Sequence, residues 1–138
     1  MRNEVVEALE ETFLPRLRAT KELLEREFPA VRFNVWSSSI GELTPHQGHN
    51  VGLDCLFPDS PGEFADNVAI IFGVKYVSTT PLLCEASVAW GHGPICVDLL
   101  PSPIAFSAVA LGAISNRFNE LVGALRSALV AGPCRAGA

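Results

Sequence analysis

The sequence lacks a hydrophobic run long enough to cross a membrane. Its longest apolar stretch, residues 104–114, spans about 11 residues and contains Ser107, whereas a membrane-spanning helix needs about 20. The N-terminal sequence MRNEVVEALEETF is acidic and has no apolar segment of the kind that marks a secretory signal. We therefore expect a soluble, cytoplasmic protein with no membrane partner.

Basic residues are also scarce. Ten Lys and Arg stand against fifteen Asp and Glu, which gives a net charge of −5. Residues 29–101 hold only two bases, Arg32 and Lys75, among seven acids. Because nucleic-acid-binding domains normally show a basic patch or stripe, we expect no nucleic-acid partner. A hydrophobic content of 49% and a charged content of 18% also exclude a charge-rich disordered chain.

Motifs for nucleotide binding and nucleophilic catalysis are absent. The sequence contains no GxxxxGK[ST], no GxGxxG and no GxSxG, although serines occupy positions 37–39. The four cysteines form no CxxC pair, and in a cytosolic chain such cysteines are usually buried small hydrophobes. We assign no catalytic residue and no cofactor, and of the two classes we favour a non-enzyme.

The pattern that is present is helical at both ends. Apolar residues from Val6 to Phe28 recur at three-to-four spacing, which predicts a long amphipathic helix that Pro15 should kink or split. At the other end, Ser102 as N-cap and Pro103 at the first helical position predict one helix that continues to Gly132.

Between these helices the period changes to two. The stretches 31–39, 50–57, 67–77, 82–90 and 95–100 alternate apolar and polar residues, which is typical of half-buried strands. The alternation places one set of residues, from Val51 in the second strand to Cys84 in the fourth, on the face that the helices cover. Because the turns between strands are short, an antiparallel arrangement is favoured over a parallel one.

These elements predict an α+β fold. We expect a two-layer sandwich in which an antiparallel meander of four or five strands carries the N- and C-terminal helices on one face, in the order α-β-β-β-β-(β)-α. The length of 138 residues fits one domain, for which we expect residues 1–132, followed by a flexible C-terminal tail at residues 133–138.

The other face of the predicted sheet would be open, and it is the surface to which we assign function. It is more apolar than a solvated face requires, with a negative bias, and apolar patches rimmed by polar groups often mark protein interfaces. Its register also places Leu56, Ser87 and Leu100 there, and a slip of one residue would exchange the two faces. The candidate partner-binding residues are Arg32, Asn34, Trp36, Asp54, Ile71, Lys75, Glu85 and Asp98.

Three chemical alternatives remain open. His46, His49 and His92 could hold a zinc ion if the loops that carry them converged. Cys84 or Cys96 could act as a thiolate beside His92. The acids Asp54, Glu85 and Asp98 could serve acid–base chemistry or bind a hard cation if their strands are neighbours.

Taken together, these features favour a non-enzymatic protein-binding domain. Small acidic α+β domains with these gross properties include immunity or antitoxin-type proteins that inhibit a basic partner enzyme. Two other functions remain as alternatives, a small metal-dependent enzyme that uses the loop histidines and a homodimeric structural domain. The expected partner is therefore a basic protein or a second copy of the chain.

Overall fold

The computed structural model describes residues 4–40, 48–57, 67–91 and 96–132. Helix α1 (Glu4–Glu27) is followed by strands β1 (Arg32–Ile40), β2 (Gly48–Leu56), β3 (Asn67–Val77), β4 (Thr80–Trp90), β5 (Cys96–Asp98) and β6 (Ile104–Ala105), and then by helices α2 (Ala108–Asn116) and α3 (Phe118–Ala131). None of the helices in these ranges is long and apolar enough to cross a membrane.

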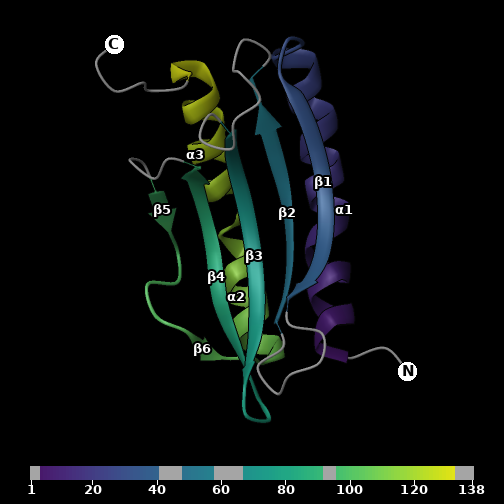
Figure 1. Cartoon of the computed structure of the whole chain (residues 1–138), viewed down its shortest axis with the longest axis vertical. Coiled ribbons are helices and arrows are strands. Elements are labelled where there is room, and N and C mark those ends of the chain that lie inside the picture. The colour runs from purple at the N-terminus through teal and green to yellow at the C-terminus, as the bar shows by residue number, and fades with distance from the viewer. Residues whose placement is uncertain (1–3, 41–47, 58–66, 92–95, 133–138) are drawn as a thin grey trace.

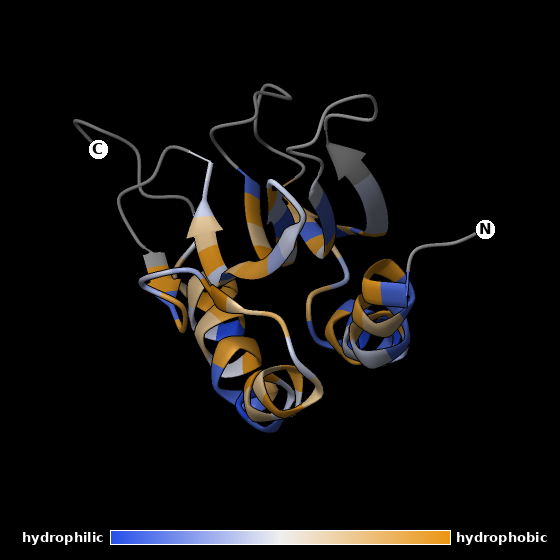
Figure 2. Ribbon diagram, turned by 90° about the horizontal axis from the view of Figure 1, so that it is seen from below, coloured by the Kyte–Doolittle hydropathy of each residue, from blue (hydrophilic) through white to orange (hydrophobic). Residues whose placement is uncertain are grey.

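The five main strands form an antiparallel meander in the order β1-β2-β3-β4-β5, and β6 pairs with the end of β4. Figure 1 shows the strands in front of the helices, and Figure 2 shows all three helices on one side of the sheet. The predicted fold class is therefore confirmed. The predicted tail at 133–138 lies outside the described residues.

Three phenylalanines hold the two layers together. Phe13 of α1 stacks on Phe72 of β3 with ring centroids 3.9 Å apart, and Phe118 of α3 lies 5.7 Å from the same ring. The aliphatic residues around them are fully buried, among them Leu9, Leu53, Ile70 and Leu121. Burial of each such side chain contributes about 1.5–3 kcal/mol, so this cluster is the main stabilising contact between helices and sheet.

Helix α1 does not split at Pro15, so of the two outcomes expected from the sequence, a kink or a split, the split is wrong. It runs from Glu4 to Glu27 as one helix. The proline is exposed, while the residues on either side of it, Phe13 and Leu17, are fully buried. Tertiary packing of this apolar face outweighs the loss of one backbone hydrogen bond.

The single C-terminal helix predicted from Ser102 is wrong in two respects. Residues 104–105 pair with Leu82 and Leu83 as β6, and the helix starts later, where the Ser107 hydroxyl accepts a hydrogen bond from the Ala110 amide at 3.0 Å. The helix is also interrupted at Arg117, whose amide donates a hydrogen bond of 3.0 Å to the Ile114 carbonyl. Because residues 104–105 are held in the sheet by β4, the helix cap is Ser107 and not the predicted Ser102.

Arg16 of α1 stabilises this interruption. Its guanidinium donates to the Ser115 carbonyl at 2.5 Å and to the Ser115 hydroxyl at 3.0 Å, and it lies 4.2 Å above the Phe118 ring. In an unbroken helix that carbonyl would accept from the amide four residues later. Arg16 supplies the donor instead, and so ties α1 to the junction of α2 and α3.

We predict that Arg16→Met lowers the free energy of unfolding by about 1–3 kcal/mol, because the Ser115 carbonyl loses its donor in a partly buried place. Urea denaturation measures the change. The matched control is Arg26→Met on the same helix, where an exposed arginine should cost less than about 0.5 kcal/mol. Equal losses in the two variants would contradict the role given to Arg16.

Candidate functional site

The side of the sheet opposite the helices, which we call the open face, carries every predicted partner-binding residue. Val51, Leu53 and Ile70 point into the core and are completely buried, so alternation turns their neighbours to the other side. The register sets these neighbours side by side across the strands. The open face comprises Arg32, Asn34, Trp36, Asn50, Gly52, Asp54, Leu56, Ala69, Ile71, Gly73, Lys75, Glu85, Ser87, Ala89 and Asp98.

Trp36 lies flat on β2 at the centre of this surface. It pairs with Gly52 in the register, and a Cβ atom on Gly52 would lie only 2.7 Å from the indole atom Cζ2. The indole Nε1 donates to Asp54 Oδ1 at 2.9 Å. Gly52 therefore allows the Trp36 ring to lie close to β2, and the hydrogen bond to Asp54 fixes the orientation of the ring.

Burial raises the pKa of the Asp54 carboxyl above its ordinary value of 3.8, and the hydrogen bond from Trp36 opposes this rise. Desolvation is the larger of the two effects. No lysine, arginine or histidine in the described residues lies within ion-pairing distance of this carboxylate. Asp54 is thus a half-buried acid whose charge is only partly compensated.

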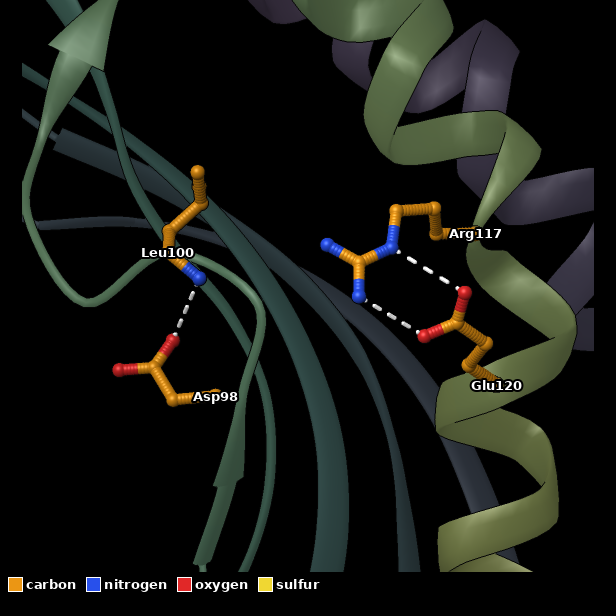
Figure 3. Close-up of polar contacts among 4 residues, drawn as sticks. All are labelled: Asp98, Leu100, Arg117 and Glu120. Carbon is orange, nitrogen blue, oxygen red and sulfur yellow. Dashed lines mark hydrogen bonds and ion pairs between the residues drawn. The ribbon is translucent and has the colours of Figure 1, made fainter.

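A second half-buried acid lies on β4. Desolvation raises the pKa of the Glu85 carboxyl. Ser87 lowers this pKa by donating a hydrogen bond to Glu85 Oε1 at 3.4 Å, and the nearby charge of Asp98 raises it further. Asp98 is exposed and accepts a hydrogen bond from the Leu100 amide at 2.8 Å (Figure 3). The same figure also draws a separate contact, the exposed ion pair of Arg117 with Glu120. Asp98 therefore also shapes the backbone after β5.

That turn corrects the predicted place of Leu100. Sequence alternation puts Leu100 on the open face, but it is only 7% exposed and belongs to the core. The Asp98 carboxylate holds the Leu100 amide, and the Leu99 amide bonds to Ala86 at 2.9 Å. Because the strand ends at Asp98, the period of two no longer applies to the residues that follow.

Cys84 is also misplaced by alternation. Gly73 pairs with Glu85, whereas the next residue Val74 pairs with Leu83, so Cys84 is the extra residue of a β-bulge. Leu83 takes the buried position that was expected for Cys84. A glycine inside a strand often marks a bulge, and Gly73 lies on β3 at the point where the register with β4 shifts. It was the one sequence feature that could have indicated this bulge.

The position of Cys84 in the bulge does not support the alternative in which this cysteine acts as a thiolate. Burial, and then the charge of Glu85, raise the pKa of the Cys84 thiol, although Lys75 acts in the opposite direction. Burial likewise raises the pKa of Cys55. Both thiols are therefore held in the protonated, unreactive form at neutral pH. His92 lies outside the described residues, as does the Cys96 side chain.

Sequence reasoning missed a cluster on the helix side of the sheet. The Ser37 hydroxyl donates to Glu10 Oε2 at 2.6 Å and lies 2.7 Å from His49 Nε2, while His49 Nε2 lies 3.5 Å from Glu10 Oε2. Because the hydroxyl gives its one proton to Glu10, the His49 nitrogen must be the donor in its contact with Ser37. A nucleophilic serine needs the opposite proton direction, so this geometry links α1 to β1 and β2 rather than activating Ser37.

The predicted zinc site is only partly within the described chain. His49 is buried at 7% exposure and turned toward α1, and His46 and His92 fall outside the described residues. In the part of the chain that the structure describes, no three His, Cys, Asp or Glu side chains gather in a way that could hold a metal ion.

Neither a protein-family model nor a curated protein nor a solved structure matches this chain. Its own geometry is therefore what supports a functional proposal.

We predict that Gly52→Ala lowers the free energy of unfolding by about 1–3 kcal/mol, because the new methyl group meets both the Trp36 ring and the Ile70 carbonyl at 2.8 Å. Thermal denaturation measures the loss, and Trp fluorescence reports the displaced indole. The control is Gly112→Ala in α2, where a Cβ meets nothing within 4 Å and helix propensity should add about 0.5–1 kcal/mol of stability. A neutral Gly52→Ala would show that the indole does not rest on this strand.

The raised pKa of Asp54 has a consequence for stability. Because the folded state holds the proton more tightly than the unfolded state, the free energy of unfolding falls as pH rises from 3.8 through the folded pKa, and the penalty is fully present above it. Asp54→Asn keeps an acceptor for Trp36 and removes this penalty.

We therefore expect Asp54→Asn to be more stable than the wild type at pH 7, and the difference to vanish below pH 3.8. Urea denaturation across this pH range measures both curves. A variant that is less stable than the wild type at pH 7 would mean that the hydrogen bond to a charged carboxylate outweighs desolvation.

Proposed function

We propose that this chain is a non-enzymatic binding protein that engages a basic protein partner through the open face. The observation that carries the proposal is the pair of half-buried carboxylates, Asp54 and Glu85, on the face opposite the three helices that the structure describes. Each has its pKa raised by desolvation, and within the described ranges neither has a cationic partner. Such groups cost stability in the free protein, and acids whose pKa is raised by burial cluster at functional sites.

A cation supplied by a partner would offset that cost. A separate arginine or lysine of the partner, placed over each carboxylate, would supply a charged hydrogen bond there, since Asp54 and Glu85 lie opposite Ala69 and Gly73, four residues apart on β3. The acidic excess of residues 29–101 would also attract a basic surface at long range and raise the rate of association. Both effects weaken with salt, because mobile ions screen charges at the surface.

Trp36 would provide the apolar part of the contact. Tryptophan is enriched among the residues that contribute most to protein interfaces. Here the ring is already held by Gly52 and Asp54 in the free protein, so binding would cost little side-chain entropy. Ile71 lies next to Gly52 in the register and extends the apolar area, with Arg32, Asn34 and Lys75 around it.

In its finer form, the proposal is that the partner is an enzyme and that the chain inhibits it, as an immunity or antitoxin-type protein does. Support for this form comes from size and acidity, so it is an analogy of composition. The metal-dependent enzyme finds no support in the described residues, because His49 is engaged with Ser37 on the helix side.

Affinity capture from the cells that make this protein tests the proposal. We expect the wild-type chain to retain a basic protein that is released by salt, and the double variant Asp54→Asn/Glu85→Gln to retain at least about tenfold less of it. The matched control is Glu4→Gln/Glu120→Gln, which removes the same charge from exposed helix positions and should capture as the wild type does.

Trp36→Ala gives a second reading of the same face. It should reduce capture while thermal denaturation shows a folded protein. If the open-face variants capture the same proteins as the wild type, in the same amounts, the open face is not the binding surface and the proposal fails.

A further inference from the structure

The two edges of the sheet differ. At one edge, β5 and β6 pair with β4 and cover part of its outer side. At the other edge β1 pairs only with β2, and no strand in the described residues pairs with its outer side. Figure 1 shows β1 at this edge with α1 behind it. A row of backbone donors and acceptors is therefore available along a strand of nine residues.

Strand β1 also has few of the features that normally prevent edge pairing. Natural edge strands are protected by lysine, proline, bulges or inward-pointing charges. The strand RFNVWSSSI contains no lysine and no proline, its register with β2 is continuous, and its one charge is Arg32 at the start. An antiparallel self-pairing centred on Val35 would set Arg32 opposite Ser38, so no like charges would meet.

Two hollows that open to solvent run along α1 beside this edge. The first is lined by Glu7, Glu10, Glu11, Leu14, Pro15 and Arg18, and it adjoins β1 because Glu10 accepts a hydrogen bond from Ser37. The second is lined by Arg18, Lys21, Glu22, Glu25, Asn34 and Val35. Charge along them is divided: the lining of the first hollow begins with Glu7, Glu10 and Glu11 and has its one base at Arg18, whereas the second mixes Arg18 and Lys21 with Glu22 and Glu25.

We propose that a second copy of this chain occupies the β1 edge, so that two β1 strands pair antiparallel about a twofold axis and form one continuous sheet. The same axis sets the two α1 helices antiparallel. The acidic half of one helix, at the exposed Glu11, then faces Arg18 of the other, while Glu10 keeps its hydrogen bond with Ser37. The surface is thus complementary to itself, as a twofold interface requires. This dimer uses the edge of β1 rather than the open face, although Asn34 borders both, and it does not depend on the proposed partner site.

Charge reversal tests the arrangement. Size-exclusion chromatography with light scattering should give twice 14.8 kDa for the wild type at low salt. Glu11→Lys and Arg18→Glu should each raise the dimer dissociation constant by about tenfold or more, because each places like charges together twice across the axis. Mixing the two variants should restore a dimer, since Lys at position 11 then meets Glu at position 18, and the double variant should restore it in one chain.

The control is Arg26→Glu, the same charge change on α1 at an exposed position that lines neither hollow, and it should leave the dimer intact. Circular dichroism confirms that each variant is folded. A monomeric wild type overturns the proposal, and so does a dimer that ignores both reversals or a mixture that fails to restore it. A dimer lost in Glu85→Lys but kept in Glu11→Lys would place self-association on the open face instead, which also overturns it.

Discussion

The stack of Phe13 and Phe118 on Phe72 is the contact on which the arrangement of the layers depends. Both helical ends of the chain meet the sheet through one aromatic side chain of the middle strand β3. They must therefore lie on the same face of the sheet, and none of the described helices lies on the other face. The proposed partner site lies on the face opposite this packing.

Periodicity was sufficient to predict the layers but not the places where a long-range hydrogen bond intervenes. The stretch 67–77 matches β3 at both ends, because alternation and β-branched residues act together there. The last helix was predicted wrongly because its start depends on the pairing of residues 104–105 with β4, and its interruption depends on Arg16. Both contacts join segments that are distant in the sequence, so no local pattern contains them.

The same limit applies to the candidate site. Alternation placed Trp36, Asp54 and Glu85 on one face, and the structure agrees. It could not reveal that the indole rests on Gly52, because that contact depends on which residues of β1 and β2 are opposite each other. The link between Glu10 and Ser37 was missed for the same reason, since it joins the first helix to the first strand.

Gly52 and Gly73 determine how two neighbouring side chains of the open face lie on the sheet. The Trp36 ring lies on Gly52, and Asn50 lies on Gly73 so closely that a Cβ there would overlap its side-chain oxygen. The side chains of Trp36 and Asn50 therefore lie along the sheet, in the space that a Cβ atom on Gly52 or Gly73 would fill. These two side chains make the surface flatter there, which leaves less depth for a side chain of a partner. At the proposed partner site, discrimination between partners would then rest on where charges lie rather than on shape.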